Sequence, residues 1–309
     1  MKTKTWLALL SLYIIWGSTY LAIFFVVETI PPFISAGLRF LISGLVLFIW
    51  RKLAGDPPPT RNQWRSAAVV GLLLLVGGNG LLSWSEQRIP SGIAALLIGT
   101  VPLWLVLIEA ARPGGTKPNW QAITGLIIGF AGIVLLIGPF NNADFNQNYD
   151  VIGIAVCILA AFLWSFGSIY SRGADLPHSA LMTTGLEMLA GSAGLFIVAT
   201  LTGEWQKFSI EAISSNSLYG LIYLITIGSL IGFVSYAWLL KNAPVSLVAT
   251  YAYVNPLVAI LLGSALAQEP LNLRILTAAG VIVGSVVLIN SSRKASVIQA
   301  DETAGAAAE

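Results

Sequence analysis

Residues 247–266, LVATYAYVNPLVAILLGSAL, are apolar enough to lie in a lipid bilayer, and yet they carry polar side chains and a proline near the middle. Proline lacks a backbone N–H and clashes with the carbonyl one turn earlier, so we expect a helix to kink at Pro256 and to free a carbonyl group. In lipid, such a defect is tolerated only where it faces protein or a water-filled cavity. We therefore predict that this segment borders the functional site of a membrane protein.

A second apolar segment matches the first. Residues 93–108, IAALLIGTVPLWLVLI, place Pro102 where the first segment has Pro256, and Pro90 and Pro244 precede these two prolines by the same 12 residues. Hydrophobic segments interrupted by proline in both halves of a chain are typical of a transporter whose binding site lies at the membrane midplane. We predict that kinks at Pro102 and Pro256 help these two helices to gate such a site.

Composition identifies the class of protein. Apolar residues make up 56% of the chain and charged residues 10%, with a mean hydropathy of +0.82, whereas a soluble domain carries about 25% charged residues. Cys157 and His178 are the only cysteine and the only histidine, which excludes an internal disulfide, a thiolate metal cluster and a histidine proton relay. We expect no metal site, no cofactor and no catalytic residue.

Apolar runs of about 20 residues recur along the chain, and they predict an all-α polytopic membrane protein with ten transmembrane helices. The first run is too long for the apolar region of a signal peptide, and no small-residue cleavage site precedes Pro31, so we interpret it as an uncleaved span. The predicted spans cover residues 6–27, 32–50, 66–85, 91–110, 120–138, 151–171, 180–201, 217–240, 246–266 and 272–290.

Basic residues between these spans predict the orientation. Twelve lie on the side that holds the N-terminus: Lys2, Lys4, Arg51, Lys52, Arg61, Arg65, Arg112, Lys117, Arg172, Lys241, Arg293 and Lys294. Three lie on the other side: Arg88, Lys207 and Arg274. Because cytoplasmic loops carry the excess of Lys and Arg, we expect both termini to be cytoplasmic in a multi-pass protein of the cell inner membrane.

Matching residues in the two halves indicate an internal repeat. Trp16 aligns with Trp164 at a shift of 148 residues, and Trp84 aligns with Trp238 at a shift of 154. With five spans in each half, the second half enters the membrane from the opposite face, as in inverted-topology repeats around a central cavity. We predict one repeat at residues 1–140, an outer linker at 141–150, a second repeat at 151–292 and a disordered cytoplasmic tail at 293–309.

Several short stretches resemble a known family: WGSTYLAI, AGLRFLISG, NGLLSWSEQ, IPSGIAALLIGTVPL, WSFGSIYS, GLEMLAGS and ATYAYVNPLVAILLG. They are similar to the drug/metabolite transporter superfamily and, more narrowly, to EamA-type bacterial inner-membrane exporters. The resemblance covers about residues 5–290. It implies a ten-helix basket with a cavity lined by spans 1, 3, 4, 6, 8 and 9, and the export of small metabolites, amino acids or drugs.

Polar and aromatic residues within the spans are the candidates for solute binding. Tyr251 and Asn255 share a helical face, whereas Tyr253 points about 160° away and can reach the same pocket only if the helix is distorted. The solute-binding residues that we predict are Trp16, Ser18, Tyr20, Asn79, Ser83, Thr100, Trp164, Ser168, Tyr236, Tyr251, Tyr253 and Asn255. Each also has a structural interpretation: the aromatic rings can pack between helices, and the polar groups can bond across helices or satisfy a freed carbonyl.

Three charges lie within or at the ends of predicted spans, where ionisable residues are costly and suggest function. Glu86 is the first candidate for contact with a proton or an amine near the outer mouth, with solvation at the interface as its alternative. Arg39 and Glu187 align at the shift of 148 residues. For these two we favour structural or gating roles, and a direct Arg39–Glu187 pair stays open.

These features favour a secondary active transporter that moves small metabolites by alternating access; export follows from the resemblance alone. The chain has no phosphate-binding loop, so we expect an ion or solute gradient to supply the energy. The alternatives are a passive channel or facilitator and an intramembrane enzyme, which would need convergent acid, base or metal ligands. The expected partners are a small-molecule solute, membrane lipid and, if protons drive transport, a proton carried by Glu86 or Glu187. We expect a monomer and no nucleic-acid partner.

Overall fold

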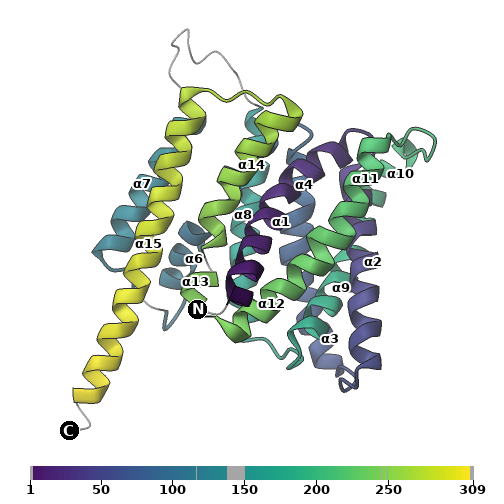
Figure 1. Cartoon of the computed structure of the whole chain (residues 1–309). Helices are drawn as coiled ribbons and strands as arrows, with labels where there is room; N and C mark the ends of the chain where they lie inside the picture. The colour runs from purple at the N-terminus through teal and green to yellow at the C-terminus, as the bar shows by residue number, and fades with distance from the viewer. Residues whose placement is uncertain (1–2, 116, 138–149, 244, 249, 307–309) are drawn as a thin grey trace.

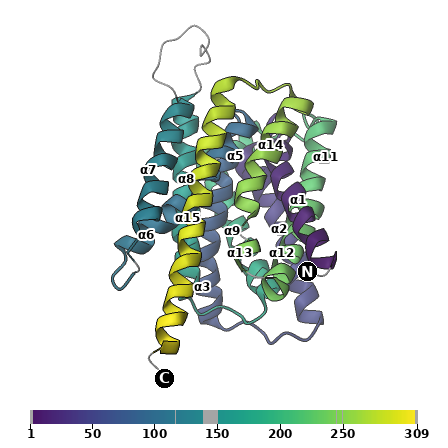
Figure 2. The same ribbon diagram turned by 60° about the vertical axis from the view of Figure 1, so that its left-hand side comes forward.

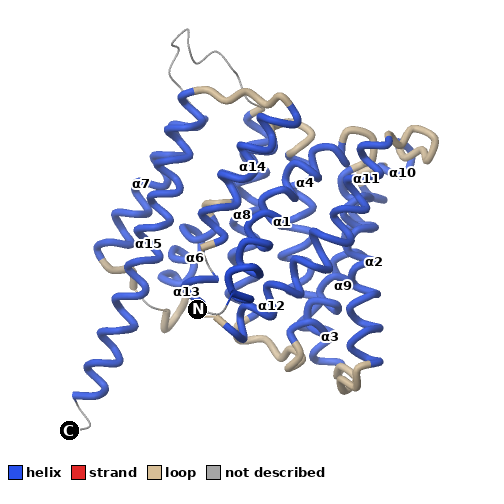
Figure 3. Tube along the Cα trace, in the orientation of Figure 1, coloured by secondary structure: helices blue, strands red, loops and turns tan. Residues whose placement is uncertain are grey.

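The computed structural model describes residues 3–115, 117–137, 150–243, 245–248 and 250–306, and every regular element in these ranges is helical (Figure 3). The helices of the first half are α1 (Thr3–Val27), α2 (Pro32–Leu53), α3 (Arg61–Gly71), the π-helical η1 (Leu72–Gly80), α4 (Leu81–Ser85), α5 (Ser91–Ile98), α6 (Val101–Ala111) and α7 (Trp120–Ile137).

The second half continues the helical pattern. Its elements are α8 (Val151–Ser171), α9 (Ala180–Leu201), α10 (Glu204–Lys207), α11 (Ser215–Tyr223), the π-helical η3 (Leu224–Ile231), α12 (Gly232–Asn242), α13 (Val245–Val248), α14 (Tyr251–Ala267) and α15 (Leu273–Ala306). The two π-helical segments each lie inside a longer helical run, η1 between α3 and α4 and η3 between α11 and α12.

Nine helical runs in the described residues are long and apolar enough to cross a membrane. They are Lys4–Val27, Pro32–Leu53, Arg61–Ser85, Ser91–Ala111, Trp120–Ile137, Val151–Ser171, Ala180–Leu201, Ser215–Leu239 and Leu273–Ser291. The prediction of an all-helical, polytopic membrane protein is confirmed. The remaining predicted span, at residues 246–266, is divided between α13 and α14, and α14 is a shorter apolar helix.

The last helix, α15, extends past its apolar portion. Helix α15 continues to Ala306, beyond the last predicted span, and the predicted disorder of residues 293–309 stays a prediction. This part of the chain is rich in alanine and also contains lysine, glutamine and glutamate, which have high helix propensities, so the helix that begins in the last span can continue beyond its apolar portion. Residues 307–309 lie outside the described residues.

The helices form one bundle in which distant parts of the sequence lie side by side. Helix α7 packs along α15, and α2 packs along α9. Helix α1 contacts α14 as well as α11 and α12 (Figures 1 and 2). Helix α1 begins, and α15 ends, toward the same end of the bundle, the lower end in Figure 1. We call the opposite end, where α1 and α14 finish, the upper end.

Small residues allow α2 and α9 to approach closely. A Cβ atom added to Gly44 would lie 2.9 Å from the Cβ of Met188 and 3.1 Å from the backbone nitrogen of Leu189. Across the contact, a Cβ added to Gly185 would lie 3.1 Å from the backbone nitrogen of Phe48. Close packing over small residues is a general way for helices to associate in lipid, where no hydrophobic driving force between them exists.

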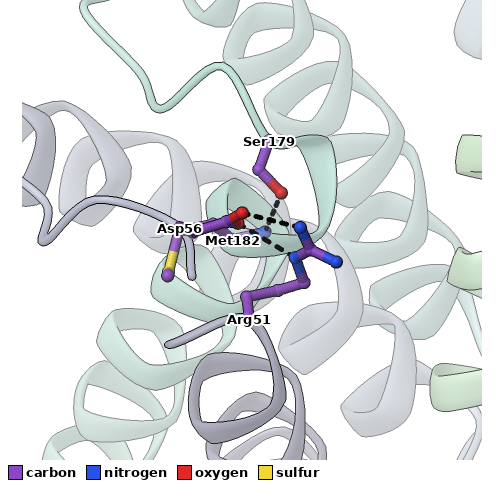
Figure 4. Close-up of polar contacts among 4 residues, drawn as sticks. All are labelled: Arg51, Asp56, Ser179 and Met182. Carbon is purple, nitrogen blue, oxygen red and sulfur yellow. Dashed lines mark hydrogen bonds and ion pairs between the residues drawn. The ribbon is translucent and has the colours of Figure 1, made fainter. Parts of the chain in front are cut away.

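Polar groups at the lower end complete the helix termini there. The Arg51 guanidinium donates to both carboxylate oxygens of Asp56, at 2.9 and 2.6 Å, and closes the turn that follows α2 (Figure 4). The hydroxyl of Ser179 accepts from the backbone N–H of Met182 at 3.4 Å and caps the start of α9. Figure 4 shows the two contacts next to each other, so the end of α2 and the start of α9 meet at this surface.

Candidate functional site

Two helical segments are interrupted in the same way. Helix α5 ends at Ile98 and α6 begins at Val101, with the Thr100 hydroxyl donating to the carbonyl of Leu97 at 2.5 Å. Helix α13 ends at Val248 and α14 begins at Tyr251, with the Thr250 hydroxyl donating to the carbonyl of Leu247 at 2.5 Å. In both places the threonine hydroxyl adds a second hydrogen bond to a carbonyl that already accepts from the backbone N–H of the same threonine, at 3.1 Å for Leu97 and 3.2 Å for Leu247.

The second interruption differs in position from the expectation. We placed it at Pro256, but α14 runs on through that residue, and the interruption lies before Tyr251. Pro102, by contrast, lies in the first turn of α6, directly after its interruption. A proline in the first turn costs a helix little, because its missing N–H has no partner there in any case. The two matched prolines therefore differ in position: Pro102 lies in the first turn of α6, and Pro256 lies inside α14.

The two interrupted segments meet each other. A Cβ atom added to Gly99, between α5 and α6, would lie 3.1 Å from Cγ of Pro256. The proline ring of one segment thus packs where the other segment has no side chain. Helix α1 joins them, since a Cβ at Gly17 would lie 2.6 Å from Cβ of Val258 and 3.3 Å from the carbonyl oxygen of Asn255.

Four aromatic side chains surround the start of α14, and we call them the aromatic cluster: Trp16, Phe233, Tyr236 and Tyr251. The Trp16 ring lies 5.0 Å from the Tyr251 ring, 5.1 Å from the Tyr236 ring and 5.5 Å from the Phe233 ring. The Tyr236 and Tyr251 rings are 6.0 Å apart and nearly perpendicular. Three of the predicted solute-binding residues therefore come together, from α1, α12 and α14.

Tyr253 faces a different part of the molecule. Its hydroxyl accepts a hydrogen bond from the side-chain amide of Asn290 on α15, and its ring packs against the apolar cluster that includes Leu103 and Val286. Asn255 is 5% exposed, and its Oδ1 has no hydrogen-bond partner among the described residues. The structure thus places Tyr251 and Tyr253 on different sides of α14, as their spacing predicts.

The other candidates are distributed over the bundle. The Ser18 hydroxyl bonds to the Tyr223 hydroxyl at 2.6 Å, and Ser168 donates to the carbonyl of Trp164 at 2.7 Å. A Cβ at Gly78 would lie 2.7 Å from the Trp164 ring, so Trp164 packs on η1 beside the half-buried Asn79. Tyr20, Ser83 and Thr100 are buried. These residues do not join the aromatic cluster directly.

Glu86 occupies an unexpected environment. We considered that it would be solvated at an interface, but the residue is 1% exposed. Neither carboxylate oxygen accepts a hydrogen bond of normal geometry in the described ranges. The main chain of Phe24 and the charged groups of Arg39 and Glu269 nevertheless lie close enough to interact electrostatically with the Glu86 carboxylate. The expectation of a solvated side chain is therefore wrong, because the surrounding helices exclude water from the upper end of α4.

Arg39 is also buried, at 6% exposure. Its Nε donates to the Ser229 hydroxyl of η3 at 2.9 Å, and its guanidinium lies 4.8 Å from the centre of the Phe40 ring. The ion pairs found in the described residues are Arg51–Asp56, Arg88–Asp150 and Arg112–Glu109, so the structure does not form the pair between Arg39 and Glu187 that the sequence left open.

Two carboxylates that the sequence analysis missed hold helix N-termini. Glu269 accepts from the backbone N–H groups of Ser91, at 2.6 Å, and Gly92, at 3.0 Å. Glu204 accepts from those of Phe33 and Ile34, both at 3.0 Å. The only sequence signal was that α5 and α2 follow Pro90 and Pro31, which cannot cap a helix with their own side chains. Burial raises the pKa of Glu204, outside the spans, more than these N–H bonds lower it.

One pocket lies at a distance from these groups. It has a volume of about 500 Å³, and its lining comes mainly from α6 and α8, with Ile108, Phe166 and Tyr170 among its residues. None of the predicted solute-binding residues lines it. The pocket is open and largely apolar, as expected of a surface groove between lipid-facing helices, and we place the candidate site at the aromatic cluster instead.

Comparison with known proteins connects this architecture to a family. The EamA-like transporter family model matches residues 3–138 and 151–291. The chain is 39% identical to the protein named uncharacterized inner membrane transporter YedA of Escherichia coli K12, over 91% of this chain and 89% of that one. It is 28% identical to protein PecM of Dickeya dadantii, over 84% and 82% of the two chains.

A solved structure supports the same fold. A crystal structure with a TM-score of 0.62 and 24% sequence identity covers 93% of this chain and 96% of its own. At this identity the likeness shows the fold alone. The matches to the family model and to YedA extend over most of the chain, and they agree with the interrupted, apolar helices described above. The chain belongs to the EamA-like transporter family.

Proposed function

We propose that the protein is a secondary active transporter that exports small metabolites, such as amino acids or related amphipathic compounds or drugs, by alternating access. The observation that carries the proposal is the meeting of the two interrupted segments, with Pro256 against Gly99, next to the aromatic cluster. Interrupted helices at the interface of two repeats are a recurring way to build a transporter site. The membership of the EamA-like transporter family supports transport, and substrate and mechanism are our proposals.

We further propose ten membrane crossings in two inverted repeats. In this arrangement residues 246–266 supply the remaining crossing as α13 and α14, and residues 1–140 and 151–292 are the repeats. The start of α1 and the end of α15 at the same end of the bundle support an even number of crossings (Figure 1). The upper end would then face away from the cytoplasm, in the inner membrane.

The orientation can be tested by labelling. With Cys157 replaced, single cysteines at Asn146 and Gly55 are treated with an impermeant thiol reagent added to intact cells. Asn146, which lies outside the described residues, should label and Gly55 should not, because the basic residues favour cytoplasmic termini. The reverse pattern would contradict the orientation.

Solute affinity tests the site. Tyr251→Phe or Asn255→Ala removes one hydrogen-bonding group, which costs about 1–3 kcal/mol, so apparent solute affinity should fall about 5- to 150-fold. The readout is a concentration series of uptake into proteoliposomes, normalised to protein. Leu261→Ala, an exposed residue of the same helix, is the control and should leave affinity unchanged. Unchanged affinity in both polar variants would remove the site from α14.

Coupling is proposed to use protons, with Glu86 as the first carrier and Glu187 as the second. Glu86→Gln should uncouple transport from the pH gradient and leave solute exchange intact. If both Gln variants respond to the gradient as the parent does, neither carboxylate carries the proton. Counterflow of a labelled solute separates this carrier from a channel, since a channel has no alternating site.

A further inference from the structure

Two carboxylates at the upper end follow the same backbone turn. Glu204 directly follows Gly203, and Glu269 directly follows Gln268; both preceding residues have a left-handed backbone conformation, with φ of 71° and 53°. Glycine adopts this conformation without steric cost, whereas a residue with a side chain seldom does. Within the described ranges, Gln268 is the only residue other than glycine with a positive φ, and it is exposed. Its turn directs Glu269 back onto α5.

The carboxylate of Glu269 closes a contact between α5 and α14. Its two oxygens accept from the backbone N–H groups of Ser91, at 2.6 Å, and Gly92, at 3.0 Å. Beside this contact the two helices touch directly, since a Cβ atom added to Gly92 would lie 3.1 Å from Cγ1 and 3.2 Å from Cα of Ile260. A Cβ added to Gly263 would lie 2.8 Å from Cδ of Glu269. Small residues on both helices therefore leave room for the carboxylate between them.

The neighbouring helix pair, α2 and α9, is joined at both of its ends. At the upper end, Glu204 accepts from the first N–H groups of α2. At the lower end, Asp56, which lies 148 residues before Glu204, closes the turn after α2 beside the start of α9 (Figure 4). Gly55 precedes Asp56 with φ of 91°, as Gly203 precedes Glu204. A pair that is joined at both ends is suited to be a fixed part of the molecule.

The two interrupted segments lack the matching group at the lower end. The residues 154 positions before Gln268 and Glu269 are Gly114 and Gly115. Gly114 has the same left-handed conformation, with φ of 74°, but Gly115 offers no carboxylate. Helix α14 packs on α5 next to Glu269, whereas α6, beyond the interruption, packs along α8. One carboxylate at the upper end therefore has no counterpart at the matched position of the other end.

We propose that Glu269 is the latch of the outer gate: its bonds to the start of α5 hold the two interrupted segments together at the upper end, and their release lets α5 and α14 separate. On opening, water reaches the N–H groups of Ser91 and Gly92 and replaces the carboxylate, so release costs only the net strength of two hydrogen bonds. Such a contact can form and break between two populated states. The proposal rests on the proposed transport function and orientation, and it assigns one gating contact to them.

Thiol labelling of the purified protein measures the opening. In a background with Cys157→Ala, Ile260→Cys supplies the only cysteine, at a position that is 6% exposed and lies against Gly92. Glu269→Ala should raise its rate of reaction with a charged methanethiosulfonate reagent about 10- to 100-fold, the shift expected from losing two hydrogen bonds of the closed state. Gly263→Ala, whose methyl group displaces the carboxylate, should raise the rate to a smaller extent.

Matched variants test whether the effect belongs to this contact. Glu204→Ala removes the same kind of contact from the α2–α9 pair and should leave the labelling rate unchanged. Glu211→Ala, at an exposed position of the loop between α10 and α11, should also leave it unchanged. A single cysteine at Ala278, which is fully buried in α15, reports loss of the fold and should stay unlabelled in every variant.

The outcomes separate the latch from the proposed function, because labelling is measured without solute and the reagent reaches both ends of the protein in detergent. An unchanged rate in folded Glu269→Ala, or an equal rise in Glu204→Ala, would overturn the latch and leave the transport function standing. If Glu269→Ala has lost its fold, Gly263→Ala decides in the same way. A raised rate together with an absence of transport for every solute in proteoliposomes would overturn the transport function and leave Glu269 as the contact that closes the upper end.

Discussion

Carboxylates at the upper end of the molecule fall into two kinds. Glu204 and Glu269 each accept backbone N–H groups at the start of a helix from the other half of the chain. Glu86 is buried nearby and has no donor on either oxygen among the described residues. The same chemical group thus stabilises two helix starts and is left unsatisfied in a third place.

The difference indicates different roles. A carboxylate that accepts N–H bonds at a helix N-terminus satisfies groups that have no partner within the helix and interacts favourably with the helix dipole. A buried carboxylate without donors adds nothing of this kind to stability, which agrees with the proton-carrying role proposed for Glu86. Substitution of a helix-capping carboxylate and substitution of Glu86 should therefore change stability in opposite directions.

The largest effect is expected at Glu269. Glu269→Ala leaves the buried N–H groups of Ser91 and Gly92 without an acceptor, at a cost of about 1–3 kcal/mol for each group. The apparent unfolding temperature of the purified protein in detergent should fall clearly, and Glu269→Gln, which keeps one acceptor oxygen, should lose less. Glu28→Ala is the exposed control. Equal unfolding temperatures for Glu269→Ala and the control would contradict the capping role.

A smaller loss is expected at Glu204. Its bonds to the N–H groups of Phe33 and Ile34 are 3.0–3.3 Å long, compared with 2.6–3.0 Å for Glu269. Glu204→Ala should therefore cost about 0.5–2 kcal/mol, the range for losing a helix cap. The same thermal unfolding measurement checks the order of the two variants, and a greater loss at Glu204 than at Glu269 would reverse the comparison.

Glu86→Gln should behave in the opposite way. Because the substitution removes a buried charge that has no hydrogen bond to lose, the unfolding temperature without solute should stay the same or rise. Transport by the same variant should lose its response to a pH gradient. A loss of stability as large as that of Glu269→Ala would show that Glu86 is a structural anchor.

The smallest expected effect is a difference between Asp150 and Glu204 in how each contributes to the pH dependence of folding stability. The N–H of Gly153 and the guanidinium of Arg88 hold the pKa of Asp150 below its usual value, so its contribution to stability is present at neutral pH and is lost as the pH falls through the lowered pKa. Burial raises the pKa of Glu204, so the folded state binds its proton more readily and stability falls as the pH rises above the usual glutamate pKa.

The two contributions therefore slope in opposite directions. Asp150→Asn should reduce the loss of stability at acidic pH. Glu204→Gln should remove the loss of stability that occurs as the pH rises above the usual glutamate pKa. Unfolding temperatures measured as a function of pH on the parent and both variants check the signs. If the unfolding temperature depends on pH in the same way in both variants, the opposite contributions assigned to Asp150 and Glu204 are wrong.

Much of the architecture could be predicted because the signal is local. The span predicted at residues 32–50 is α2, Pro32–Leu53, and the span predicted at 151–171 is α8, Val151–Ser171. A run of about 20 apolar residues is visible in the sequence and needs no partner to be recognised. The opposite directions of Tyr251 and Tyr253 also follow from helical spacing alone.

Other features required contacts between distant residues. The interruption before α14 lies at Thr250, and the helix continues through Pro256, whose ring packs against Gly99 of the other half. The burial of Glu86 depends on helices that the sequence does not place around it. The carboxylates that cap α2 and α5 could not be predicted either, since Glu204 lies 170 residues from Ile34 and Glu269 lies 178 residues from Ser91.

By itself, then, the sequence determined that this chain forms apolar helices, with its prolines, glycines and charged residues at fixed positions along them, because helix length, apolar periodicity and the missing N–H of proline are properties of neighbouring residues. Only the tertiary structure decided which of these residues meet. The aromatic cluster, the contact between Gly99 and Pro256, and the unpaired charges of Arg39 and Glu86 all depend on side chains from separate helices, and the packing of those helices in space sets which groups find partners.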